Sequence, residues 1–121
     1  RSGNQMAMYL NGSSVATSTS SIADFATTAD TIYIGKPGNA NNAFFKGNFS
    51  SLSLFDETIS DASVTKLYNS GKPGDVSKSG IDGLVAWLPL DETSGNFIDR
   101  TSTGADGVPQ NTPTQGDTSV P

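Results

Sequence analysis

The sequence predicts an all-β fold, an antiparallel β-sandwich with one short helix, because its apolar residues lie in short segments separated by turn-forming residues. Charged residues make up only 16% of the 121 residues, and 13 glycines and 6 prolines divide the chain. Ser, Thr, Asn and Asp, which are poor helix formers, are abundant. One domain of this length can bury a two-layer core with little surplus.

A β-hairpin is predicted near the start of the chain. Residues 5–10 form an apolar strand pattern, and residues 13–17 form the returning strand. Between them stands Asn11-Gly12, which suits a type I′ turn because both central residues of that turn need a positive φ. Residues 31–35 are rich in β-branched side chains and predict a further short strand.

Three more strands are expected farther along. Residues 44–55 predict the longest one, and the irregular alternation near Phe49 favours a β-bulge. Residues 84–90 predict an apolar strand in which Pro89 indicates a sheet edge or the end of the strand. Residues 97–98 predict a short strand, and the tail from Pro109 is expected to be extended.

One helix is predicted between Ser60 and Gly71. Ser60 is a suitable N-cap, and Gly71 suits the left-handed position that ends many helices. Val64, Leu67 and Tyr68 lie three and four residues apart and form one apolar stripe. A helix of two or three turns is marginal alone, so packing of this stripe must hold it.

Composition and charge exclude several functions. The net charge is −5 with 7 basic residues, so the chain lacks the basic surface that binds nucleic acid. No apolar run reaches the ~20 residues that cross a bilayer, so membrane insertion is not expected. Cys and His are absent, which removes thiolate chemistry and the usual general base. We expect no catalysis, and no enzyme.

Two blocks of short motifs resemble the laminin-G-like (concanavalin-A-like) jelly rolls. The first resembles the back half of that domain, with a Tyr-x-Asn-Gly hairpin, an Ile-Gly strand, a Phe-x-Gly strand and a short helix. The second resembles its opening strand. The motifs concerned are residues 8–15, 32–35, 45–55, 59–61 and 67–71 in the first block, and residues 83–92 with Ser94, Gly95 and Asp99 in the second.

The order of the blocks is reversed relative to the family. We therefore expect residues 1–75 to be the back half of a sandwich, 76–83 a linker, and 84–121 opening strands plus an extended tail. The chain could straddle two tandem repeats. Alternatively, its C-terminal strands could complete a sandwich within the chain or across chains. Because Arg1 is not an initiator and a strand pattern begins within five residues, we expect the chain to be part of something longer.

A calcium site is one candidate function of the turns. Asp91, Glu92 and Asp99 come from adjacent turns, and Ca²⁺ prefers such oxygen ligands. The resemblance implies the same, because many jelly rolls of this class hold a structural Ca²⁺. The alternative is that these carboxylates cap turns. Ser50 and Ser51 stand where the family often has acidic residues, which favours the alternative.

A glycan site is the second candidate. Asn39, Asn41 and Asn42 lie in a predicted loop beside Tyr33, and their amides could bind sugar hydroxyls. Trp87 could stack on a sugar ring, but its apolar strand favours a place in the core.

The sequence thus favours a non-catalytic structural and adhesive surface module, part of a virion or extracellular assembly. Its expected partners are neighbouring copies or other subunits, with surface glycans as further candidates. The chain is also similar, more loosely, to virion structural and surface proteins of phages. The alternative is a carbohydrate-binding module of a larger secreted protein or enzyme. A glycosidase pair is disfavoured, because Asp56/Glu57 and Asp91/Glu92 are sequence neighbours on polar turns.

Overall fold

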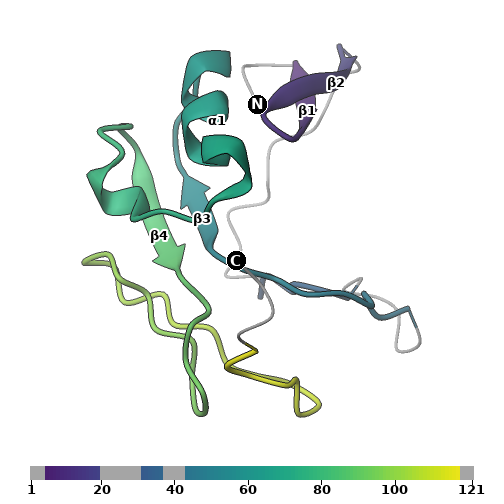
Figure 1. Ribbon diagram of the computed structural model, residues 1–121, viewed down its shortest axis with the longest axis vertical. Coiled ribbons are helices and arrows are strands. Elements are labelled where there is room, and N and C mark those ends of the chain that lie inside the picture. Colours follow the sequence, from purple (N-terminus) through teal and green to yellow (C-terminus); the bar gives the residue numbers. More distant parts are fainter. Residues whose placement is uncertain (1–4, 20–30, 37–42, 118–121) are drawn as a thin grey trace.

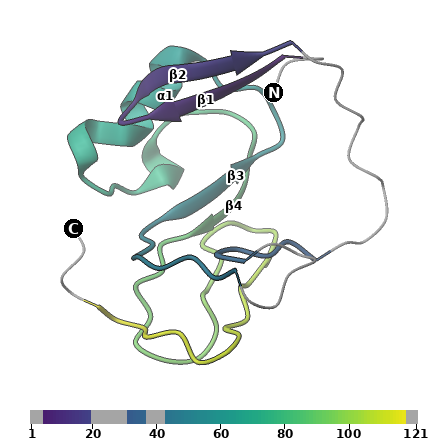
Figure 2. The same cartoon turned by 90° about the vertical axis from the view of Figure 1, so that its right-hand side faces the viewer.

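The computed structural model describes residues 5–19, 31–36 and 43–117 (Figure 1). Two antiparallel two-stranded sheets and one α-helix are the main elements of this part of the chain. Figure 2 shows α1 beside the β1–β2 hairpin, with the β3–β4 sheet below them. The elements are β1 (Met6–Leu10), β2 (Ser13–Ser18), β3 (Leu52–Phe55), α1 (Asp61–Tyr68), the 3₁₀ turns η1 (Asn69–Gly71) and η2 (Val76–Lys78), and β4 (Leu84–Leu88).

The predicted hairpin is confirmed. β1 pairs with β2, and the turn residues Asn11 and Gly12 have φ values of 51° and 75°, as a type I′ turn requires. The pairing shifts between Met8 and Tyr9, which face Ala16 and Ser14, so the extra residue lies on β2. This β-bulge leaves β1 regular and disrupts β2.

The second sheet joins segments that are distant in the sequence. β3 pairs with β4, with Leu52 opposite Leu88 and Leu54 opposite Ala86. β4 ends at Leu88, directly before Pro89, as the proline predicted. Because the two strands flank the predicted linker at 76–83, the two predicted blocks share one sheet.

The predicted helix is confirmed, but it ends earlier than expected. The Ser60 side chain accepts a hydrogen bond from the Ser63 backbone N–H at 3.1 Å, which caps the N-terminus. At the other end Asn69, not Gly71, takes the left-handed capping conformation. Asn tolerates this conformation, so the helix ends two residues before the glycine. Gly71 also has a positive φ, at the end of η1.

Three strand predictions are wrong in whole or in part. Residues 31–36 form no strand, since their one backbone hydrogen bond to a described residue joins Gly35 to Phe45. The predicted strand at 44–55 shortens to β3, because Ser51 has a φ of 55°, which interrupts extended backbone. The irregularity expected near Phe49 lies instead between Leu54 and Phe55. The expected strand at 97–98 is a single bridge between Phe97 and Gly107.

Residues 31–36 and 43–50, which we call the arm, extend away from the rest of the molecule (Figure 1). The rings of Phe45 and Phe49 pack together there, with centroids 4.6 Å apart. Ile32, Phe44 and Phe45 are nevertheless at least half exposed. Phe45 and Phe49 therefore pack against each other and not in a core.

The core of the described residues is small. Ala86 and Leu88 of β4 are the only apolar residues there that are buried, at 3% and 5% exposure. In the helical stripe, Val64 and Leu67 are only partly buried, and Tyr68 is 37% exposed. The two sheets thus do not close over each other as the layers of a complete sandwich do.

Candidate functional site

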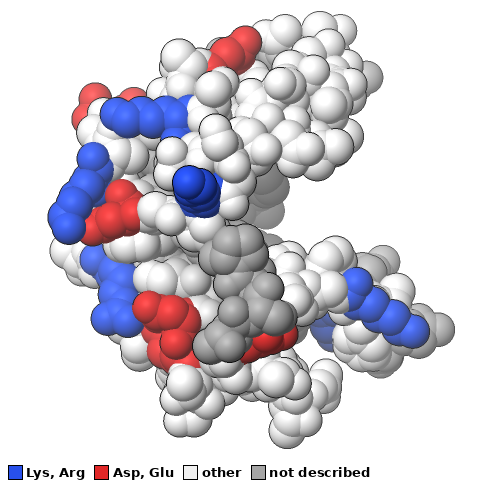
Figure 3. Space-filling model, in the orientation of Figure 1, with Lys and Arg blue, Asp and Glu red and all other residues white. Residues whose placement is uncertain are grey.

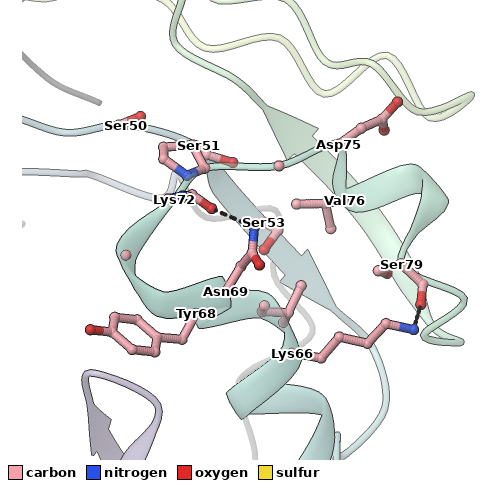
Figure 4. Close-up of a pocket in the computed structure, with 14 residues that line it drawn as sticks. Ser50, Ser51, Ser53, Lys66, Tyr68, Asn69, Lys72, Asp75, Val76 and Ser79 are labelled. Atoms are coloured by element: carbon pink, nitrogen blue, oxygen red, sulfur yellow. Dashed lines mark hydrogen bonds between the residues drawn. The ribbon is translucent and has the colours of Figure 1, made fainter.

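A groove of about 520 Å³ lies between β3, the C-terminal end of α1 and the segment that follows the helix (Figure 4). Its lining combines hydroxyl, amide and charged side chains with a few apolar ones. Among the residues that line it are Ser51, Ser53, Asn69, Lys72, Val76 and Ser79. The groove exists because the left-handed turn at the end of α1 sends the chain back across β3.

Several polar groups of the groove already have partners. The Asn69 side-chain amide donates to the Lys72 carbonyl at 3.1 Å, and the Lys66 ammonium donates to the Ser79 carbonyl. The Ser51 hydroxyl accepts from the Trp87 indole N–H at 3.0 Å. Figure 4 shows the Tyr68 ring turned away from the groove, toward the hairpin. The groove can therefore offer hydrogen bonds to a ligand, but no aromatic platform from Tyr68.

The densest polar cluster surrounds Asp99, which is only 6% exposed. Its carboxylate accepts hydrogen bonds of 2.9 Å each from the backbone N–H groups of Trp87, Thr101 and Ala105. The hydroxyls of Thr101 and Thr103 donate to it as well, at 2.7–2.9 Å. One buried carboxylate thus ties residues 99–105 to the middle of β4.

These contacts control the ionisation of Asp99. Burial by itself would raise the pKa of this carboxyl, but the hydrogen bonds from Trp87, Thr103, Thr101 and Ala105 outweigh it and hold the pKa well below its ordinary value. Asp99 is therefore a charged structural acceptor at neutral pH. Its electron pairs are directed at donors of its own chain, which leaves little room for a metal ion.

The two neighbouring acids face a cation. Arg100 lies 3.4 Å from an Asp91 carboxylate oxygen and 3.7 Å from the Oε1 of Glu92. Glu92 Oε1 also accepts from the Ile98 backbone N–H at 2.9 Å. Its Oε2 is buried, and no described residue hydrogen-bonds to it. Asp91 and Glu92 thus stabilise the turn before residues 97–100. Their carboxyl groups are not arranged on the two sides of an open cleft.

The predicted calcium ligands do not converge on one site. Within residues 5–19, 31–36 and 43–117, no three or more Asp, Glu, His or Cys side chains are placed to hold a metal ion. Asp99 is surrounded by donors, and Asp91 and Glu92 are paired with Arg100. The contacts match the alternative reading of these residues, in which the carboxylates cap turns. The sequence carried a signal for this, because an Asp side chain in a turn commonly accepts from the backbone N–H two residues later, as Asp99 does from Thr101.

The predicted glycan residues lie mostly beyond what the structure describes. Asn39, Asn41 and Asn42 fall outside the described residues. Tyr33 lies in the arm, is 48% exposed, and has the Lys36 ammonium 4.8 Å from its ring centroid. A cation over one face of the ring competes with a sugar for that face. Trp87 is half-buried in β4, in keeping with the packing role favoured for it.

The comparison with known families decides what kind of chain this is. A laminin G-like family model, described as concanavalin A-like lectin/glucanases superfamily, matches residues 1–65, which is more than half of the 121 residues. The chain belongs to this superfamily. Its members are β-sandwiches, so the resemblance and the fold class predicted from the sequence are confirmed. No curated protein and no solved structure matches the chain.

The family model covers the N-terminal half of the described elements and not the C-terminal ones. It begins before the hairpin, includes β1, β2 and β3, and ends inside α1. Domains of this laminin G-like kind are typically extracellular and generally non-enzymatic, although the superfamily includes glucanases. The helices of the described residues include none long and apolar enough to cross a membrane. The groove and the Asp99 cluster are built largely from residues after the match.

Proposed function

We propose that this chain is a non-catalytic structural and adhesive module of a virion or other extracellular assembly, and that it works by contacts between subunits. The observation that carries the proposal is the number of large apolar side chains that the described strands and arm leave exposed.

The exposed area is largely apolar where the strands lie. Met8 and Leu10 of the hairpin are 62% and 63% exposed, and Ile32 and Phe45 of the arm are 70% and 56% exposed. Large contiguous apolar surfaces mark interaction sites in soluble proteins. A two-stranded sheet is also marginal in water without further strands or a helix against it. α1 lies beside the hairpin, but Met8 and Leu10 stay exposed, and assembly with other subunits would cover them.

The test is the mass of the purified chain in solution. Light scattering over a concentration series should show a defined oligomer that dissociates on dilution, and negative-stain images should show particles of one size. A well-folded monomer at all concentrations would contradict the proposal. Hydrolysis of a polysaccharide by the purified chain would contradict its non-catalytic part.

Carbohydrate binding is the second candidate, and the groove beside β3 is the observation that favours it. Hydroxyl and amide groups line its wall, and Lys66 and Lys72 are among the lining residues. The unmodified chain would then bind a defined set of sugars on a glycan array. Lys72→Ala should weaken that binding, while Lys46→Ala, in the arm, should not. Equal effects of the two substitutions, or no bound glycan, would contradict this candidate.

A further inference from the structure

We infer that the outer edge of β1 is the assembly surface and that its occupant is the β1 strand of a second copy, paired antiparallel about Met8. This inference rests on the proposed function, because it names the partner and the surface through which subunits would join. It would give a continuous four-stranded sheet in the order β2-β1-β1-β2.

The first support is that this hairpin has no charge to keep another strand away. Residues 5–18 contain no Asp, Glu, Lys, Arg or Pro. The surface over β1 and β2 is correspondingly uncharged in Figure 3. Monomeric proteins usually protect exposed strand edges with charges, prolines or bulges. A chain of net charge −5 repels its copies elsewhere, so an uncharged edge is where two copies can approach.

The second support distinguishes β1 from β2. The bulge places its extra residue, Val15, on β2, which bends that strand and disturbs its outer edge. β1 is regular, and its residues make no backbone hydrogen bond to any described residue outside β2. Of the two hairpin edges, β1 is thus the one ready to accept a strand.

The third support is that β1 is complementary to itself. Met6, Met8 and Leu10 share one face, because side chains alternate along a strand. Antiparallel pairing about Met8 places Met8 opposite Met8 and Met6 opposite Leu10. Six apolar side chains then meet on one face of the new sheet, in a two-fold interface of the commonest kind. If the two β1 strands paired in a register shifted by one residue, fewer of these six apolar side chains would contact one another.

Cysteine cross-linking tests the pairing directly, since the natural chain has no cysteine. Met8→Cys should form a disulfide-linked dimer on mild oxidation at least about tenfold faster than Val15→Cys, because its thiols are held opposite each other. Val15 is the matched control, at 51% exposure on the same hairpin. An equal mixture of Met6→Cys and Leu10→Cys should cross-link mainly as mixed dimers, whereas each alone should not.

A charge at the centre of the interface gives a second readout. Met8→Lys places two like charges directly opposite each other, which is unfavourable across strands. It should raise the concentration of half-assembly by about tenfold or more, and Val15→Lys should leave it unchanged. If the unmodified chain assembles but Met8→Cys links no faster than Val15→Cys, the edge inference is wrong and the proposed function stands. If the unmodified chain does not assemble, both are wrong.

Discussion

Replacing Asp99 with alanine removes the acceptor on which residues 99–105 depend. Three backbone N–H groups and two threonine hydroxyls donate to this carboxylate. The hydroxyls of Thr101 and Thr103 also reach the Val85 carbonyl, at 3.1 and 2.6 Å, so they retain a partner. The Ala105 N–H belongs to an exposed residue and can be rehydrated. The main loss falls on the N–H of Trp87, inside β4.

The size of the effect follows from these partners. A buried donor left without an acceptor costs about 1–3 kcal/mol, and the partly rehydrated groups cost less. We therefore expect Asp99→Ala to lower the free energy of unfolding by about 3 kcal/mol, a large fraction of the 5–15 kcal/mol typical of a domain. Asp99→Asn should lose nearly as much, because its amide N–H₂ would face donors.

Urea titration at fixed protein concentration measures this loss. Trp87 is the single tryptophan, and its backbone N–H donates to Asp99. Its fluorescence therefore reports the affected strand. The control is Asp82→Ala, since Asp82 is exposed and its side chain bonds to no described residue. The slope of the titration should stay constant while the midpoint falls. Equal midpoints for Asp99→Ala and Asp82→Ala would refute the reasoning.

The pH dependence gives a second view of the same group. The pKa of Asp99 is lowered in the folded chain. The ionised carboxylate therefore contributes its full share of the folding stability above its unfolded pKa of about 3.9. Stability should fall as the pH drops below about 4, toward the lower folded pKa. In Asp99→Asn, the part of the stability loss below about pH 4 that comes from protonation of Asp99 should be absent. A wild-type stability that does not change between pH 5 and pH 2 would contradict the assignment.

Three further predictions concern single structural features. Ser60→Ala removes the cap of α1 and should cost about 1 kcal/mol, measured by urea titration, whereas Ser60→Asp should restore the cap; equal loss in both would contradict the capping role. Gly12→Ala should cost about 1–3 kcal/mol in thermal melting, because its φ is 75° and a Cβ would lie 2.9 Å from the Tyr68 ring; an unchanged melting temperature would show that the hairpin does not pack on α1. Leu88→Ala should cost about 2–4 kcal/mol by the same melts, since Leu88 is one of the few buried apolar residues; a loss below that of Ser60→Ala would contradict its core position.

The sequence predicts the parts of the fold that are encoded locally. The hairpin depends on Asn11-Gly12, two residues whose conformational preference alone selects the turn. The helix depends on the Ser60 cap and on apolar spacing within eight residues. Both signals act over a few residues, so no knowledge of distant neighbours is needed. Both elements are confirmed.

The parts that failed depend on distant partners. Residues 31–35 have strand-forming side chains, but a strand needs a neighbouring ladder, and the described residues provide one hydrogen bond. Pairing of β3 with β4 could not be read from the apolar pattern, because the two strands are about 30 residues apart. Asp99 could be recognised as a carboxylate of interest, but only the fold shows that the backbone of β4 occupies it.

The most direct test of subunit assembly through β1 is amide hydrogen exchange of Met6–Leu10 over a concentration series. In the isolated hairpin, the β1 amides that point away from β2 have no partner among the described residues, so they should exchange rapidly in dilute solution. If subunits join through β1, these same amides become protected as the chain assembles. Protection that is already complete at monomer concentrations, or exchange that stays fast in the assembled state, would contradict it.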